Sequence, residues 1–218
     1  SSSKDAFYIL LSGLCFGIHL YTYFQSIQAS SVGIGVISLF TFPMITTILE
    51  PIVLGVKPKR KDVLLGLSVL VGVFFIVSES EFKMNELKGV GLGIISAFTY
   101  TVRNLIQKYR LLNYSPMPIL FYQFLVTYLI LIPNTEIVYS EISTTNYLYL
   151  LLLSIVFTII PHLAVIESLK KFDARSVGLI LTLQVFYAIL FASLLLKEEL
   201  KPSIIIGALI VVIAVGYE

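Results

Sequence analysis

Eight long apolar runs, separated by short polar or Gly/Pro-containing segments, constrain the fold of this chain more than any other feature. They cover approximately residues 6–27, 32–54, 62–79, 88–110, 117–133, 146–169, 173–196 and 202–217. A bilayer core about 30 Å thick needs roughly 20 apolar residues per helical crossing, whereas barrel strands have about ten residues of alternating polarity. Because these runs are long and do not alternate, we predict an all-α membrane protein with eight membrane-spanning helices.

The composition supports a lipid-facing exterior. Hydrophobic residues make up 57% of the 218 residues and charged residues 13%, against about 25% charged residues in typical soluble domains. The net charge of +2 gives no indication of nucleic-acid binding. A single cysteine, Cys15, excludes an internal disulfide framework and a cysteine-based metal site, and we expect no cofactor.

Lysine and arginine predict the orientation, because short loops rich in these residues stay on the cytoplasmic side. If the loop after the second span is inside, only Lys83, Lys88, Lys197 and Lys201 of the 15 basic residues fall outside. Both termini of the bundle are then predicted to lie inside.

An internal repeat relates two halves, which we place at residues 1–79 and 80–218. The segment Ala29-Ser30-Ser31-Val32-Gly33 recurs as Ala174-Arg175-Ser176-Val177-Gly178, and His19-Leu20 recurs upstream as His162-Leu163. Five spans separate equivalent points, so the two copies should insert with opposite orientation. Inverted-topology repeats are a known feature of transporters, although a duplicated bundle without a transport role is left open.

Several segments in both halves resemble EamA-domain transporters of the drug/metabolite transporter superfamily. They are Ser38–Pro43, Leu49-Glu50-Pro51, Ser168–Lys171, Ser176-Val177-Gly178, Leu183-Gln184 and Leu196–Glu199. The resemblance implies ten spans in two five-helix repeats, so we expect that two helices which should precede Ala6 are missing here. The chain departs from the family pattern at Val185, where a proline is frequent, and at Glu167, where an aromatic residue is frequent.

The two histidines, His19 and His162, lie toward the middle of their spans at nearly equivalent positions of the repeat. Ionisable residues within spans are expensive and often functional, and an imidazole titrates near pH 6.5 when unperturbed. We therefore predict that both contact substrate or a transported proton. The alternative is that each hydrogen-bonds a neighbouring helix.

Arg103 shares one face of its span with Ser96, Tyr100, Gln107 and Arg110. This spacing predicts that Arg103 points into the bundle, where it could attract an anionic substrate group. The alternatives are snorkelling toward the headgroups and structural pairing. Thr41, Tyr100 and Gln184 are predicted to line the same cavity between the halves, together with Arg103 and the histidines.

Three charged residues near the inner helix ends are candidates for a gate or an ion pair. Glu50 lies close to Lys57–Lys61 in sequence, and Glu167 and Lys171 have the i,i+4 spacing that favours pairing. The alternative is that the carboxylates couple ion movement to transport.

The sequence thus predicts a secondary transporter, not an enzyme, since no Gly-x-Ser-x-Gly or His-Glu-x-x-His motif is present. We expect export of small metabolites by alternating access, driven by a proton gradient or by the substrate's own gradient. The expected location is a bacterial inner membrane, with a small-molecule substrate and membrane lipid as partners and no nucleic acid. A receptor or scaffold, a channel, and a homodimeric state are left open.

Overall fold

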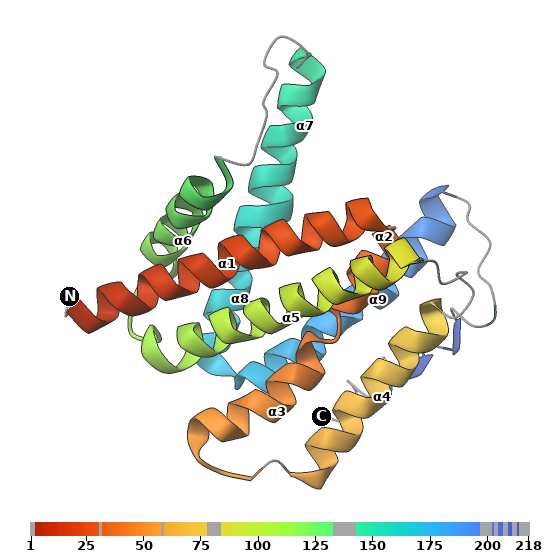
Figure 1. Ribbon diagram of the computed structural model, residues 1–218, viewed down its shortest axis with the longest axis horizontal. Coiled ribbons are helices and arrows are strands. Elements are labelled where there is room, and N and C mark those ends of the chain that lie inside the picture. The colour runs from red at the N-terminus through yellow and green to blue at the C-terminus, as the bar shows by residue number, and fades with distance from the viewer. Residues whose placement is uncertain are drawn as a thin grey trace.

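The computed structural model describes residues 3–30, 32–57, 59–77, 84–132 and 143–196, and the separate positions 202, 205, 206, 209, 210 and 213. Regular secondary structure in these residues is entirely helical (Figure 1). The helices before residue 79 are α1 (Ser3–Ala29), α2 (Val32–Leu39), α3 (Phe42–Leu54) and α4 (Arg60–Val77). Those after it are α5 (Met84–Arg110), α6 (Pro116–Leu131), α7 (Thr144–Ser154), the π-helical η3 (Ile155–Ile159), α8 (Ile160–Lys171) and α9 (Ala174–Leu196). The predicted boundary at residues 79 and 80 and most of the span predicted at 202–217 lie outside the described residues.

α1 packs lengthwise and antiparallel against α5 (Figure 1). Near one end of the pair, Ser26 Oγ donates a hydrogen bond to the carbonyl of Gly89 at 2.6 Å. At the other end, the guanidinium of Arg110 lies 5.1 Å from the centroid of the Tyr8 ring. The start of α1 therefore lies beside the end of α5, and the end of α1 beside the start of α5. This is the arrangement expected of two helices that cross a membrane in opposite directions.

Small residues let α1 approach α6 closely. A methyl group on Gly13 would lie 2.9 Å from Cβ of Val126, and one on Gly17 would lie 3.1 Å from Cδ1 of Ile130. Residue numbers rise together along these two helices, so α1 and α6 run parallel. Such contacts are typical of helix packing in lipid, where close van der Waals approach replaces the hydrophobic effect as the driving force.

α3, α8 and α9 also contact α5. The hydroxyls of Thr46 on α3 and Thr101 on α5 lie 3.3 Å apart, and α3 runs parallel to α5 and antiparallel to α9. Lys108 Nζ donates to the carbonyls of Leu169 and Phe172 at 2.7 Å each, which ties the end of α5 to the end of α8. These relative directions agree with the alternating insertion predicted from the basic residues.

The single helix predicted over residues 32–54 is wrong, because α2 and α3 are separated at Phe40 and Thr41. Pro43 explains the break: proline has no N–H, and its ring clashes with the carbonyl four residues earlier, which belongs to Leu39. The chain turns more tightly instead. Both the backbone N–H and the hydroxyl of Thr41 donate to the carbonyl of Ser38, at 3.3 Å and 2.8 Å.

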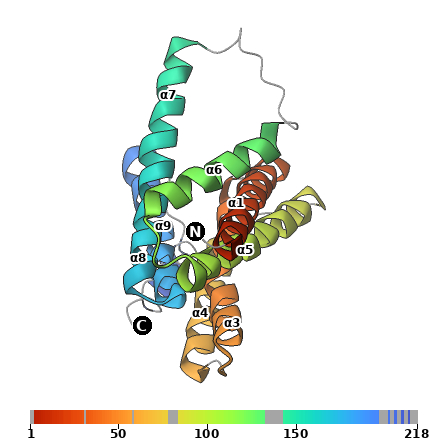
Figure 2. The same ribbon diagram turned by 90° about the vertical axis from the view of Figure 1, so that its left-hand side faces the viewer.

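The span predicted over residues 146–169 is one helical column with a π-helical turn, η3, in its middle (Figure 2). Pro161 is the second residue after this turn, and in a regular helix its ring would meet the carbonyl of Phe157. The wider turn relieves that clash, since the N–H of Ile160 bonds the carbonyl of Ile155, five residues back. A π-turn adds one residue to the helix and rotates the side chains that follow it.

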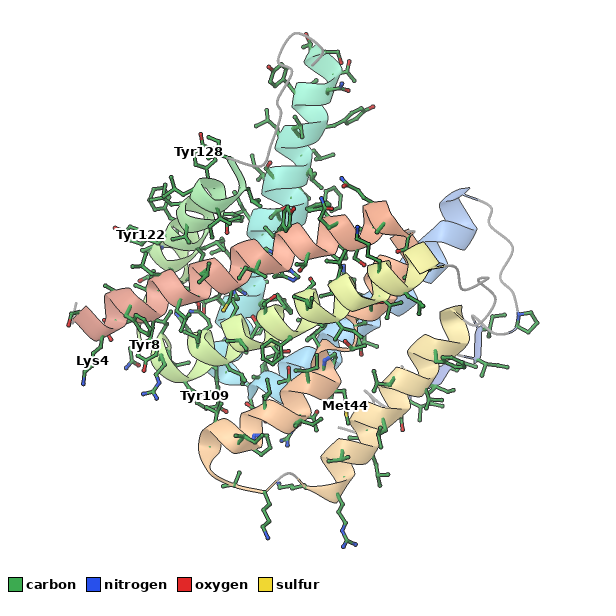
Figure 3. All side chains as sticks on the ribbon, in the orientation of Figure 1. Lys4, Tyr8, Met44, Tyr109, Tyr122 and Tyr128 are labelled. Carbon is green, nitrogen blue, oxygen red and sulfur yellow. The ribbon has the colours of Figure 1, made fainter. Side chains whose placement is uncertain are left out.

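Large apolar side chains cover the outside of the bundle. Phe7 on α1 and Leu64 on α4 are more than half exposed, and α7 has no buried residue. Tyr122 and Tyr128 project outward from α6 (Figure 3). Within the described residues, Ser3–Ala29 and Thr144–Lys171 are long and apolar enough to cross a membrane, and Phe42–Leu54 and Pro116–Leu131 are shorter apolar helices. An apolar surface of this extent is typical of contact with lipid or with other helices.

Candidate functional site

A cavity of about 380 Å³ lies between the two halves of the chain. Its lining comes from α1 and the α2–α3 break in the first half, and from α5, α7, η3, α8 and α9 in the second. The ring-bearing side chains in the wall are His19, Tyr23, Phe24, Phe40, Phe42, Tyr100, Phe157 and His162. None of the described lining residues carries a carboxylate, an ammonium or a guanidinium group. The cavity therefore offers an apolar, largely aromatic surface with few hydrogen-bonding groups, which is the usual character of a small-molecule site.

A larger depression of about 620 Å³ lies elsewhere, near Lys4, Tyr8 and Tyr109 at one end of α1 and α5 (Figure 3). It is wide open and is lined by residues at helix ends, including Arg110. The cavity between the halves is more enclosed and is lined by four of the six predicted substrate-binding residues, so we take it as the candidate site.

His19 is held by a neighbouring helix. Its Nδ1 lies 2.8 Å from Oγ and 3.2 Å from the carbonyl of Ser96 on α5. The hydroxyl hydrogen of Ser96 is already donated to the carbonyl of His19 at 3.0 Å. Nδ1 must therefore carry the proton and donate it, which fixes the tautomer of the ring. One edge of His19 thus joins α1 to α5, and the ring also lines the cavity.

His162 has a different environment, although it lines the same cavity. Its ring makes a T-shaped contact with Phe16, with the two ring centroids 4.7 Å apart, and its centroid lies 6.4 Å from that of the Tyr100 ring. Its Nδ1 is buried and has no hydrogen-bond partner among the described residues. An unpaired buried polar atom in a native fold calls for a reason, and a bound ligand is one.

Arg103 points into the bundle, as its helical spacing predicts, and is 0% exposed. Its guanidinium donates to side-chain oxygens of Gln123 and Asn104 and lies 5.0 Å from the centroid of the Phe16 ring. Arg103 is not among the described residues that line the cavity, because Phe16 and His162 intervene. Tyr100 and Gln184, by contrast, lie in the cavity wall as described.

Thr41 lies at the break between α2 and α3, next to the cavity-lining Phe40 and Phe42. Its hydroxyl is donated to the carbonyl of Ser38, and Thr41 itself is not among the lining residues. The structure thus gives Thr41 a local role in the turn.

Glu50 binds across the two halves. It is 3% exposed, and its carboxylate accepts hydrogen bonds from the Tyr109 hydroxyl at 2.6 Å and from the backbone N–H groups of Ala174 and Arg175 at 2.9 Å and 3.0 Å. Those N–H groups belong to the first turn of α9, where the helix dipole favours a negative charge. The hydrogen bonds of Glu50 are therefore with α5 and α9, although the described lysines of the loop that is nearest in sequence, Lys57 and Lys59, line a pocket together with it.

Glu167 pairs with Lys170 at 3.5 Å, in i,i+3 spacing, rather than with Lys171 as predicted. Glu167 and Lys171 are both exposed at the end of α8. An exposed pair of this kind contributes little to stability.

Two features of the site, a helix break and a π-turn, are caused by prolines. Neither feature was predicted from the sequence. Pro43 places Phe40 in a helix break and Phe42 at the start of α3, and Pro161 places the π-turn close to His162. Both could have been predicted, because a proline inside an apolar run indicates an interruption of the helix.

An apolar-surfaced bundle of helices with a cavity at its helix interruptions is typical of multi-pass membrane transport proteins. The model of one family, described as the EamA-like transporter family, matches residues 1–78 and 87–217. The chain therefore belongs to the EamA-like transporter family, and is a multi-pass membrane transporter of the drug/metabolite transporter superfamily.

A solved structure whose title reads only "Crystal structure of protein" shares the fold. It superimposes with a TM-score of 0.80 at 15% sequence identity, and the match covers 99% of this chain and 78% of that one. At this identity the likeness concerns the fold alone. Among curated proteins there is no match.

Proposed function

We propose that this chain is a secondary transporter that moves small metabolites through the cavity between its halves by alternating access. The observation that carries the proposal is that His19 and His162, which occupy corresponding positions in the predicted repeat, line one cavity. In transporters with inverted repeats, the substrate site lies between the repeats and beside interrupted helices. The break at Phe40 and Thr41 and the π-turn η3 supply such interruptions.

We further propose that Glu50 closes the inner side of the cavity. It joins α3 of the first half to α5 and α9 of the second, and Ala174 and Arg175 lie in a segment predicted to be inside. A carboxylate at a helix N-terminus contributes roughly 0.3–1 kcal/mol, up to about 2 kcal/mol where partly buried. A contact of that size can hold one state and still release it during each transport cycle.

Glu50→Gln should weaken this closure, because an amide loses the charge that favours the N-terminus of α9. A cysteine placed at Leu181 in the cavity wall should then react faster with a membrane-impermeant thiol reagent applied from the inner side. The Leu181→Cys chain with Glu50 intact is the matched control, and the chain with only Cys15 gives the background. Equal labelling rates with and without Glu50 would show that Glu50 does not close the inner side of the cavity.

Flux in proteoliposomes tests the transporter itself. Vesicles carrying the full-length protein are loaded with a pooled metabolite extract, and the loss of each compound is compared with protein-free vesicles, with and without a pH gradient. We expect selective loss of one compound class, with export as the working direction. Loss that depends on the gradient would favour proton coupling, whereas equal flux at several pH values would exclude it. A folded protein that moves none of the compounds would contradict the carrier.

A further inference from the structure

Arg103 holds a positive charge inside the bundle that no described side chain neutralises. Its Nε and Nη2 donate to Oε1 of Gln123 at 3.2 Å and 2.8 Å, and its Nη1 donates to Oδ1 of Asn104 at 3.0 Å. Both partners are neutral amides, and no carboxylate of the described residues is within ion-pair distance of Arg103. A guanidinium stays protonated in proteins, and a buried charge without a counter-charge is expensive. A ligand of opposite charge would offset that expense.

Phe16 separates the guanidinium of Arg103 from the cavity, and the electric field of the guanidinium acts across this ring. The guanidinium carbon lies 5.0 Å from the centroid of the Phe16 ring, and that centroid lies 4.7 Å from the centroid of the His162 ring. The guanidinium is therefore within about 10 Å of a residue in the cavity wall. Phe16 is fully buried and apolar, so water does not screen the interaction along this path.

His162 supplies an independent sign of a ligand. Its Nδ1 is buried without a partner among the described residues, on a ring that lines the cavity. Nδ1 itself is covered in this conformation, so a turn of the ring is needed before it can donate a hydrogen bond, in the tautomer with a proton on Nδ1, to an oxygen of a bound molecule. Charge-assisted hydrogen bonds of this kind are stronger than neutral ones.

We propose that the cavity binds an organic anion with an apolar ring or chain. A carboxylate or sulfonate oxygen of the ligand accepts the hydrogen bond of His162 Nδ1, and Arg103 attracts the negative charge through Phe16 without touching it. The apolar body of the ligand packs on the aromatic wall formed by Tyr23, Phe42 and Tyr100. This inference rests on the proposed function and names the substrate class of the same site.

The positive charge of Arg103 favours an anionic ligand over a cationic one in this cavity. Aromatic walls by themselves attract cations, but the field of Arg103 opposes a cation in this cavity. Two unit charges about 10 Å apart, at an effective dielectric constant of about 20, change a dissociation constant by roughly 15-fold. An anion should therefore bind about 15-fold more tightly than a neutral molecule of the same shape, and a cation should bind more weakly than either.

Three ring compounds of matched size test this order: benzenesulfonate, benzenesulfonamide and phenyltrimethylammonium. The first is an anion and the third a cation at every usable pH, so protonation does not confuse the comparison. Binding is measured by ligand-observed NMR on the full-length protein in lipid nanodiscs. We expect benzenesulfonate to bind most tightly. Arg103→Gln should lose most of that advantage while affinity for benzenesulfonamide stays unchanged, and Arg103→Lys should keep the order.

The wild-type protein alone can overturn the inference, so it does not depend on whether Arg103→Gln folds. Binding of phenyltrimethylammonium as tightly as benzenesulfonate would contradict it, as would equal losses of benzenesulfonate affinity in Arg103→Gln and Arg103→Lys. Failure of all three compounds to bind would also contradict it. That last result would leave the transporter proposal standing, provided that the metabolite extract still shows selective flux.

Discussion

His19 and His162 occupy corresponding positions in the predicted repeat and line the same cavity, yet their surroundings differ. His19 lies in an uninterrupted helix, α1, is 5% exposed, and donates to Ser96 on α5. His162 follows a π-turn and a proline at the start of α8, and its Nδ1 has no partner among the described residues.

The difference shows how the regularity of a helix affects the role of a histidine. In the regular helix His19 is bound to another helix, whereas after the π-turn His162 is left available to a ligand. A regular helix lets α1 lie along α5 over its length, so His19 meets a hydroxyl at hydrogen-bond distance. The π-turn and Pro161 rotate the following residues, so His162 forms a T-shaped ring contact with Phe16 and lines the cavity instead. The resulting prediction is that His162 matters for transport and His19 for folding, although sequence alone ranks them equally.

The largest effect is expected from His162→Phe, which keeps the ring and its packing on Phe16 but removes Nδ1. A hydrogen bond to a charged group contributes about 1.5–3 kcal/mol, so flux should fall roughly 10- to 100-fold. Thermal stability should stay the same or rise, because an unpaired buried polar atom is removed. The measurement is initial flux at equal amounts of folded protein, and normal flux would remove His162 from the site.

Pro161→Ala is expected to act next most strongly, because it removes the steric reason for the π-turn. If α7 and α8 then form a more regular helix, one residue less in the turn rotates α7 by about 100° relative to α8. The wall at Phe157 and Thr158 would change, and flux should fall severalfold. A matched control is Pro118→Ala, which lies in the first turn of α6 and does not line the cavity. Equal flux in both variants would mean that the π-turn does not shape the site.

His19→Phe should lower stability more than it lowers flux per folded molecule. It removes the 2.8 Å bond to Ser96 while keeping an aromatic ring against Tyr100. Loss of a buried hydrogen bond costs about 1–2 kcal/mol, which is measured as a lower unfolding midpoint in detergent. A loss of flux as large as that of His162→Phe, without loss of stability, would break the distinction between the two histidines.

Ser96→Ala should have the smallest effect, because His19 Nδ1 keeps the backbone carbonyl of residue 96 at 3.2 Å. Interhelical hydrogen bonds in membranes are worth about 0.6 kcal/mol on average, and the unfolding midpoint should fall by a correspondingly small amount. The double variant with His19→Phe should lose less stability than the two single variants added together. Full additivity would show that the two side chains do not act as a pair.

Much of this architecture follows from the sequence, because membrane insertion and helix periodicity are local properties. Long apolar runs require helices, since backbone groups must be satisfied within the chain in lipid. The three- and four-residue spacing around Arg103 correctly indicates which helix face is buried. The same reasoning failed over residues 32–54. The run is apolar throughout, which predicted one helix, but Pro43 divides it into α2 and α3.

The sequence by itself determined the class of the protein, its family and the inward-facing sides of its helices. Only the tertiary structure decided which inward-facing group meets which. It joined Glu50 to the first turn of α9, placed the amides of Gln123 and Asn104 against Arg103, and left Nδ1 of His162 unpaired among the described residues. The physical reason is that periodicity fixes the direction of a side chain from its own helix, whereas its partner depends on how separate helices are placed by packing.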